Sequence, residues 1–368
     1  MKKGKKFWNT VKVPLFAILC SLVAGGVIIA LTGSNPFRAY YALLQGSGLA
    51  PKASYANYKS MLTDFFSYVN YFTPMIFAAL AVAVAMRAGL FNIGVSGQML
   101  AAGFTATALV GYSGLGAVLA KPLVILIGMA VGGLVGALIG FLKYRFNINE
   151  VVSSIMLNYI IQYVVSFFIN TCFVDPVSRQ SIEISAASRL TFMDTLIGNL
   201  KLDIPLGILL ALLAVAAVWF LFEKTRLGYE LKAVGCSRSA AKYAGIRVGR
   251  CMVVSMTISG VLGGLAGVTY YLGYVGSIQP KVLLSTGFDA IAVSLLGSNH
   301  PVGIIFSTML ISLMGKGSTY MKSMAGVDSE IASVITGIIL LFSACNVYMK
   351  HQLEKRQREK ALSGKEEK

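Results

Sequence analysis

Long runs of apolar residues limit what this chain can fold into more than any other feature of its sequence. Most runs approach the roughly 20 residues that cross a bilayer core about 30 Å thick, and only 13% of the residues are charged. The runs lie near residues 13–31, 66–86, 90–112, 121–142, 151–173, 204–222, 251–273, 285–297, 301–316 and 331–349. We therefore expect an all-α, multi-pass membrane protein with about ten transmembrane or membrane-embedded helices.

The eighth and ninth runs are short, and Asn299, His300 and Pro301 separate them. Proline fixes its own φ and disfavours helix at the preceding residue, so a break is expected there. The pattern leaves open whether the segment 285–316 crosses the membrane fully or forms a hairpin within it.

Basic residues gather between particular runs. With ten segments, about two thirds of the Lys and Arg residues fall on the face that carries both termini and the loop 223–250, and the positive-inside rule makes that face cytoplasmic. The net charge of +17 is then explained by retained loops beside membrane lipid, and no nucleic-acid partner is expected. The expected location is the cell membrane.

No stretch between the runs is long enough for a soluble domain of its own. We expect a basic cytoplasmic tail over 1–12, one transmembrane domain over 13–349, and a charged cytoplasmic tail over 350–368. The first run is longer than the core of a signal peptide and no Ala-x-Ala site follows it, so it is predicted to be an uncleaved helix.

Motifs for covalent chemistry are missing from the sequence. It contains no HExxH or GxSxG pattern and no GxxxxGK[ST] phosphate loop, and its five Cys lack metal-site spacing. We expect no catalytic residue, metal or cofactor on this chain. If transport uses ATP, another chain must hydrolyse it.

A polar stripe runs along the fifth segment at every fourth residue. Its members are Glu150, Ser154, Asn158, Gln162, Ser166 and Asn170. On an α-helix this spacing gives one slowly winding line, which should not face lipid. The stripe either bonds neighbouring helices or lines a path for a neutral polar solute, because amides both donate and accept hydrogen bonds.

Glycines at the same spacing predict a different property in two other segments. The fourth segment has Gly128, Gly132, Gly136 and Gly140, and the seventh has Gly260, Gly263, Gly264 and Gly267. Faces of small residues allow helices to approach closely, so both faces are expected to pack against other helices.

Two further features are candidates for a solute path. The stretch 89–98 holds three glycines with Asn92 and Gln98, which disfavours a continuous helix. It is either irregular backbone at membrane depth, as in transporter sites, or a simple cytoplasmic turn. Asp289 begins the eighth run and is either a functional intramembrane carboxylate or one favoured by the helix dipole.

The loop 223–250 predicts two short helices outside the membrane. Gly235 can end the first, Ser237 can cap the second and Gly245 can terminate it. A helical wheel places small residues and a tyrosine on one arc and basic residues opposite, namely Ala240, Ala241, Tyr243 and Ala244 against Arg238 and Lys242. Such a helix suits docking on a partner protein, or it rests on anionic lipid.

Five blocks of sequence together resemble the permease family of ABC importers for branched-chain amino acids, simple sugars and nucleosides. The blocks are 89–98, 146–159, 228–246, 287–301 and 326–337. The likeness runs from about residue 35 to 349, and the second, fourth and fifth blocks look like the nucleoside-uptake branch. Ser96 stands where relatives often carry Glu, which weakens any role for that position.

The resemblance implies a permease subunit that imports nucleosides by alternating access, together with partner chains. These are ABC ATPase subunits holding ATP and Mg, a second and different permease, and an extracytoplasmic substrate-binding lipoprotein. It also makes 228–246 the segment on which the ATPase docks. The residues expected to couple there are Gly228, Glu230, Ala233, Gly235, Ala240, Ala241, Tyr243, Ala244 and Gly245. The residues expected along the solute path are Asn158, Gln162, Ser166, Asn92, Gln98 and Asp289.

Other functions stay open on the sequence alone. The solute could be a related polar molecule such as a simple sugar. An ion-coupled secondary transporter would need intramembrane carboxylates, for which Asp289 and Glu150 are the available groups. A membrane scaffold that transports nothing would leave the Asn158 stripe without a role in uptake.

Overall fold

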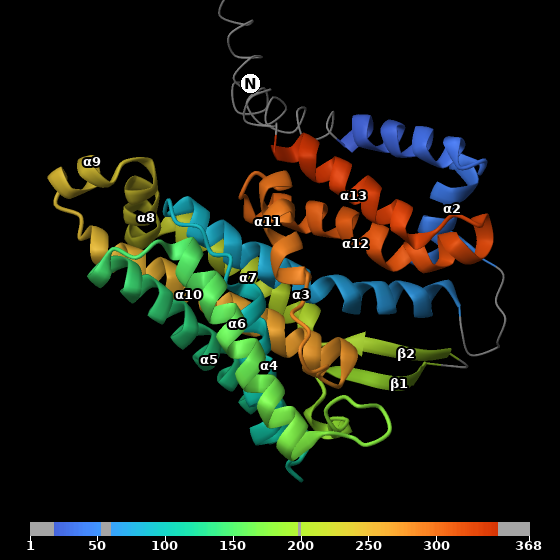
Figure 1. Ribbon diagram of the computed structural model, residues 1–368, viewed down its shortest axis with the longest axis horizontal. Coiled ribbons are helices and arrows are strands. Elements are labelled where there is room, and N and C mark those ends of the chain that lie inside the picture. Colours follow the sequence, from blue (N-terminus) through green and yellow to red (C-terminus); the bar gives the residue numbers. More distant parts are fainter. Residues whose placement is uncertain (1–17, 53–59, 198–199, 345–368) are drawn as a thin grey trace, which may run out of the picture. The chain divides into compact units, whose positions relative to one another are not determined.

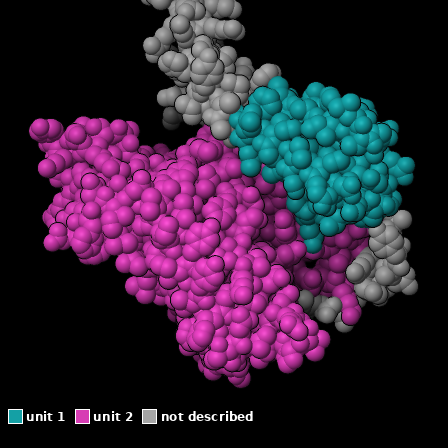
Figure 2. Space-filling view, in the orientation of Figure 1, with its two compact units in different colours: residues 1–46, 313–368 teal, residues 47–312 magenta. Residues whose placement is uncertain are grey.

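The computed structural model describes residues 18–52, 60–197 and 200–344 of the chain (Figure 1). The chain divides into two compact units, one formed by residues 1–46 and 313–368 and the other by residues 47–312 (Figure 2). The expected tails 1–12 and 350–368, and the outer ends of the first and last apolar runs, lie outside the described residues.

The first unit is helical throughout its described part. A helix over Ile18–Leu31 is followed at 114° by α2 (Pro36–Gly46), and the unit also holds α13 (Ser329–Ala344) and the later part of α12 (Pro301–Ala325). The start of α2 is set locally, because the Asn35 side chain accepts the Phe37 N–H at 3.0 Å and proline is favoured in a first turn.

The second unit is built around two buried helices, α3 and α10. The other helices of this unit surround them. The elements are α3 (Met61–Arg87), α4 (Val95–Ala106) with the π-turn η1 (Thr107–Gly111), α5 (Ala117–Phe146), α6 (Glu150–Phe168) with η2 (Ile169–Phe173), the 3-10 turn η3 (Ala186–Ser188), α7 (Gly207–Lys224), α8 (Arg226–Cys236), α9 (Arg238–Tyr243), α10 (Val248–Thr269) with η4 (Tyr270–Val275), and α11 (Thr286–Leu296). A helix that is apolar on all sides, as α3 is, belongs in the interior.

The glycine faces of α5 and α10 pack directly against each other. A Cβ added at Gly132 would overlap the Gly260 carbonyl oxygen, and one at Gly136 would overlap that of Met256. Gly264 joins this contact with α5, whereas two glycines of α10 serve α4, since Gly263 lies against Gln98 and Gly267 against the Met99 backbone. The predicted close packing through small residues is confirmed.

Six described helices are long and apolar enough to cross a membrane, and a seventh span results if the bent pair at the N-terminus counts as one. The six are α3, α5, α6 with η2, α7, α10 with η4, and α12. Three shorter apolar helices correspond to the runs that contain α4, α11 and α13. Each of the ten predicted runs thus contains a helix, whereas the number of crossings stays a prediction.

The break between the eighth and ninth runs is confirmed, but the ninth segment is longer than its apolar run. The helix α11 ends at Leu296, Ser298 and Asn299 adopt positive φ values, and α12 then starts at Pro301 and continues to Ala325. Polar residues such as Lys316 end the apolar run but do not end the helix. Of these two helices, α12 is long enough to cross the membrane, whereas α11, with 11 residues, is not.

The expectation of an all-α chain is wrong in one segment. The strands β1 (Thr191–Ile197) and β2 (Leu200–Pro205) form an antiparallel hairpin in which Thr191 pairs with Pro205. The second strand alternates apolar and polar residues, the two-residue period that favours strand over helix. This alternation is the signal that the search for apolar runs passed over.

Candidate functional site

Two short helices follow the end of α7 and form the segment expected to dock on a partner. Thr225 caps α8 by accepting the Gly228 N–H at 3.1 Å, and Ser237 caps α9 by accepting the Ala240 N–H at 3.3 Å. Gly245 has φ +79° just beyond α9, a conformation that glycine adopts without strain. The predicted cap at Ser237 and the predicted stop at Gly245 are confirmed.

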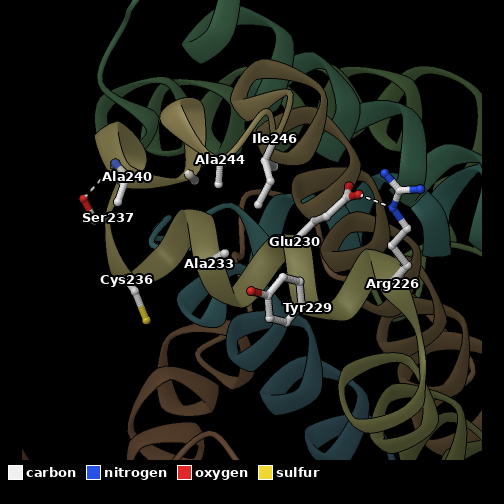
Figure 3. A pocket seen from close by; sticks show the side chains of 10 residues that line it. Arg226, Tyr229, Glu230, Ala233, Cys236, Ser237, Ala240, Ala244 and Ile246 are labelled. Atoms are coloured by element: carbon white, nitrogen blue, oxygen red, sulfur yellow. Dashed lines mark hydrogen bonds and ion pairs between the residues drawn. The ribbon is translucent and has the colours of Figure 1, made fainter.

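A groove of about 480 Å³ opens between α8 and the residues of α9 and its following turn (Figure 3). Its walls are mostly small or apolar, with one ion pair at the rim, where Arg226 Nε lies 2.9 Å from Glu230 Oε1. The lining residues are Arg226, Tyr229, Glu230, Ala233, Cys236, Ser237, Ala240, Ala241, Ala244 and Ile246. A concave surface of this kind fits a helix or loop of a protein partner.

The residues predicted for coupling do not all share one surface. Ala240 and Ala244 are exposed at the groove, and Tyr243 is 94% exposed but does not line it. Ala241 lines the same groove but is only 2% exposed, so it is the most buried of the three alanines of this arc. A six-residue helix needs one face to pack on its own protein, and Ala241 supplies that contact.

Two of the predicted glycines act by close packing. A Cβ at Gly228 would overlap the Leu221 carbonyl oxygen, so Gly228 lets α8 fold back on α7. A Cβ at Gly235 would overlap the Arg87 carbonyl oxygen at the end of α3. Gly235 therefore holds α8 against α3 and does not end the helix, which continues to Cys236.

The docking segment touches the irregular stretch between α3 and α4. Arg238 donates a hydrogen bond from Nη2 to the Gly89 carbonyl oxygen at 3.1 Å, and Gly89, at φ +69°, lies against Gly235. Two residues before Gly89, Arg87 stacks over the Phe222 ring at 4.8 Å and donates to the Asn299 carbonyl oxygen at 2.9 Å. A displacement of α8 and α9 would therefore act on this stretch directly.

Of the predicted irregular stretch 89–98, only Gly89 to Gly94 is irregular, because α4 already begins at Val95, and the amides of Asn92 and Gln98 meet in the interior. Asn92 donates to Ser259 Oγ at 2.7 Å and to Gln98 Oε1 at 3.2 Å, and its own Oδ1 accepts the Gly94 N–H. Ser259 in turn donates to the Ala81 carbonyl oxygen. The structure thus brings Asn92 and Gln98 together in one buried network that joins α3, α4 and α10.

The polar stripe faces its own protein over most of its length, but Asn170, at its far end, is exposed. Asn158 accepts the Gly97 N–H at 3.0 Å and donates to the Ile93 carbonyl oxygen at 3.1 Å, while Gln162 donates to the Lys281 carbonyl oxygen and Ser166 accepts the Lys281 N–H. The stripe thus bonds α6 to the start of α4 through Asn158 and to the loop residue Lys281 through Gln162 and Ser166. Ser154 differs, because its buried hydroxyl has no partner among the described residues.

Asp289 lies apart from these groups, on the first turn of α11. Its carboxylate is half-buried, shares a hydrogen bond with the Ser285 side chain, and acts electrostatically on the Tyr71 hydroxyl. Among residues 18–52, 60–197 and 200–344 it has no ion-pair partner. The carboxylate is thus neither paired with a cation nor fully buried.

Sequence reasoning missed the connection between the docking segment and Gly89, and it missed the tyrosines near Asp289. Gly89, two residues after Arg87 at the end of an apolar run, indicates a turn there, because glycine adopts positive φ without strain, but no local pattern reveals Arg238 as its partner. Tyrosines scattered through two separate runs carry no comparable signal.

Comparison with known proteins places this arrangement in a family. A family model described as branched-chain amino acid transport system / permease component matches residues 65–344. The nucleoside ABC transporter permease protein NupB of Lactococcus lactis subsp. cremoris (strain MG1363) is 34% identical over 360 residues, which cover 95% of each chain. The guanosine ABC transporter permease protein NupP of Bacillus subtilis (strain 168) is 36% identical over 335 residues, 90% of this chain and 92% of that one.

A third relative bears a different name. The glucose ABC transporter permease protein TsgB13 of Haloferax volcanii is 26% identical over 353 residues, which cover 93% of this chain and 89% of that protein. The family model spans well over half of the chain, and the two relatives above 30% identity span nearly all of it. This multi-pass membrane chain therefore belongs to the permease components of the branched-chain amino acid transport system family.

Proposed function

We propose that the chain is the permease subunit of an ATP-driven ABC importer that carries nucleosides across the cell membrane. The observation that carries the proposal is the groove of α8 and α9, together with the hydrogen bond from Arg238, also on α9, to Gly89 at the break between α3 and α4. The names of the two relatives at 34% and 36% identity support nucleosides as the solute.

In the proposed topology, ten segments cross or enter the membrane and both termini are cytoplasmic. The domain 13–349 is the permease, and 1–12 and 350–368 are its cytoplasmic tails. The basic residues around α8 and α9 support a cytoplasmic position for these helices.

The ATPase subunits seat on the groove, and they alone hold ATP and Mg. Of the predicted coupling residues, Glu230, Ala233, Ala240, Ala241 and Ala244 line this seat. Tyr243 extends from its edge, and Gly228, Gly235 and Gly245 give α8 and α9 their shape. A second, different permease completes the pathway, and an extracytoplasmic lipoprotein delivers the solute.

Movement passes from the groove to the interior through named contacts. Closure of the ATPase pair shifts α8, and Gly235 presses on the Arg87 backbone while Arg238 draws on Gly89. The network of Asn92, Gln98 and Ser259 then rearranges, because it begins three residues from Gly89. Access alternates as α3, α4 and α10 tilt.

Six polar residues are proposed along the solute path, in two groups and one isolated carboxylate. Asn158, Gln162 and Ser166 border α4 and the segment near Lys281, and Asn92 and Gln98 form the second group. Asp289 stands alone on α11. In the described arrangement the amides bond to protein, so solute contact requires that the helices separate during the cycle.

Reconstitution tests the proposal. The chain is purified with its ATPase, second permease and lipoprotein, placed in proteoliposomes, and supplied with labelled guanosine. Uptake that requires ATP and the lipoprotein is expected. Uptake by this chain alone under an ion gradient would establish the secondary transporter instead, and uptake of labelled glucose that excess guanosine does not reduce would overturn nucleosides as the solute.

A further inference from the structure

Three tyrosines of the second unit form a half-buried cluster near Asp289. The Tyr71 and Tyr274 ring centroids lie 5.4 Å apart with planes at 72°, and those of Tyr270 and Tyr274 lie 6.1 Å apart. We call Tyr71, Tyr270 and Tyr274 the tyrosine cluster. None of the three residues is fully buried.

The cluster lies at the end of α10 that is remote from α8 and α9. Counted along that helix, Tyr270 is about 33 Å from Val248 at 1.5 Å per residue. Figure 1 shows α8 and α9 near one end of α10 and the hairpin of β1 and β2 near the other. If α8 and α9 are cytoplasmic, the cluster is in the outer half of the membrane, where a solute would arrive.

The backbone that carries two of these tyrosines is unusual and firmly held. Tyr270 and Tyr274 belong to the π-turn η4, a kind of segment often found at functional sites. Its carbonyl groups bond to the hairpin region, where Leu190 N–H reaches Leu272 O at 2.9 Å and Thr191 Oγ1 reaches Gly273 O at 3.0 Å. A displacement of the hairpin region around Leu190 and Thr191 can therefore move the rings of Tyr270 and Tyr274.

Asp289 supplies the polar part of the same site. It is on the first turn of α11, whose 11 residues extend about 16 Å, roughly half of a bilayer core. A partial helix that begins at membrane depth is a common way to build a transporter site. The Asp289 carboxylate has no cation among the described residues and bonds the Ser285 side chain, and its remaining lone pairs can accept hydrogen bonds from a solute.

Resting on the proposed nucleoside import, we infer that Tyr71, Tyr270, Tyr274 and Asp289 form the site that holds the solute inside this permease. The tyrosine rings contact the flat face of the base, and the Asp289 carboxylate accepts hydrogen bonds from two donors of the same molecule. Ribose offers such a pair in its 2′- and 3′-hydroxyls, and guanine offers one in N1–H and its 2-amino group.

The test uses the reconstituted four-component importer with saturating, solute-loaded lipoprotein. Removing a stacked ring weakens base binding about 10- to 100-fold, so Tyr274→Ala is expected to lower guanosine uptake at least tenfold. Tyr274→Phe, which keeps the ring, is expected to lose less than threefold. Tyr112→Ala is the matched control, because it removes a half-buried tyrosine stacked on Phe173 at 5.2 Å outside the cluster.

Asp289→Asn keeps the size of the side chain and is expected to lower uptake about tenfold. Its loss is compared for guanosine, inosine and 2′,3′-dideoxyguanosine, each as a ratio to the unaltered importer, so that the preference of the lipoprotein cancels. A loss that disappears for the dideoxy compound identifies the hydroxyls as the donors. A loss that is much smaller for inosine identifies the 2-amino edge.

The two proposals fail in different ways. If the unaltered importer takes up no nucleoside, the proposed function is wrong. If it takes up guanosine while Tyr274→Ala and Asp289→Asn match it in rate, the importer stands and the assigned site is wrong. Equal losses for all three nucleosides in Asp289→Asn would also exclude Asp289 as a solute contact.

Discussion

Both halves of the Asn158 amide are bonded within the protein, and this gives the residue a structural task whatever else it does. Its oxygen accepts the Gly97 N–H and its nitrogen donates to the Ile93 carbonyl oxygen, at the start of α4. The side chain is 2% exposed. Removing it would leave the buried Gly97 N–H and the partly buried Ile93 carbonyl oxygen without this partner, and an unpaired buried group costs about 1–3 kcal/mol.

Asn158→Leu is therefore expected to lower the free energy of unfolding by about 2 kcal/mol or more and to reduce uptake along with it. Thermal unfolding of the detergent-purified chain, measured beside nucleoside uptake, checks this. A variant with unchanged thermal stability would show that these hydrogen bonds contribute little.

Gln162→Leu is the informative companion, because Gln162 is half-buried and makes a single bond, to the Lys281 carbonyl oxygen at 2.7 Å. If the stripe lines the solute path, this variant is expected to keep its thermal stability and lose uptake several-fold. Normal uptake and normal thermal stability in this variant would mean that the stripe serves only to hold neighbouring segments together and does not line the solute path.

At the scale of elements, the closest contact in the second unit is the one between α5 and α10. Adjacent glycines of α5 allow a matched comparison. A Cβ at Gly132 would overlap the backbone of Gly260 and Gly264, whereas the one tight neighbour of a Cβ at Gly133 is a methyl group of Val261 at 3.0 Å, with Thr257 at 3.9 Å or more. Backbone cannot move aside without separating the helices, but a side chain can rotate.

Gly132→Ala is expected to destabilise the chain by about 1–3 kcal/mol through overpacking. Gly133→Ala is expected to stay within about 1 kcal/mol of the original, because the helix propensity gained by alanine offsets a small adjustment. Unfolding temperatures of the two purified variants decide the matter. Equal temperatures would mean that α5 and α10 separate more easily than their geometry indicates.

The two helices of the docking segment give a second matched pair. Ala240 lines the groove, while Ser239 is exposed on the same helix and does not line it. Ala240→Arg is expected to abolish ATPase co-purification and uptake, with normal membrane insertion, because a long cation occupies the groove. Ser239→Arg adds the same charge and is expected to retain both. Loss of co-purification in both variants would point to charge and not to the groove.

These elements also show what a sequence can and cannot predict. The glycine faces, the Ser237 cap and the Gly245 stop depend on spacing within one helix or turn, and each was predicted correctly. Ala241 depends on which face of α9 packs inward, and a six-residue helix has too little periodicity to reveal that. The contact of Arg238 with Gly89 joins positions 149 residues apart, so no local pattern contains it.

At the scale of the whole molecule, the same limit applies to crossings and orientation. Hydropathy found every described apolar helix, but it cannot say whether α4, α11 and α13 pass through a bilayer or end inside it, because length alone decides only for the six long helices. It also passed over β1 and β2, where alternation and not apolar length carries the signal. Orientation rests on the distribution of Lys and Arg, which the fold does not test.

Two well-exposed positions in the second unit make orientation measurable. Tyr243, on α9, is 94% exposed, and Val177, in the loop after α6, is 92% exposed. Val177 follows α6 with η2, which extends over 24 residues, about 36 Å of helix. Because α6 starts beside α5, where Glu150 pairs with Lys143 at 2.9 Å, and α5 meets α10 near Gly249, Val177 is expected on the face opposite α9.

Val177→Cys and Tyr243→Cys, each in a chain whose five native Cys are replaced, are expected to react oppositely with a membrane-impermeant maleimide. In intact cells the reagent should label the first variant and leave the second unlabelled until the membrane is opened. The reverse result would place α8 and α9 outside the cell, where no ATPase could reach the groove, and labelling of both from outside would mean that α6 does not cross. Only the expected pattern allows a cytoplasmic ATPase to act through α8 and α9 on a solute that enters from the other face.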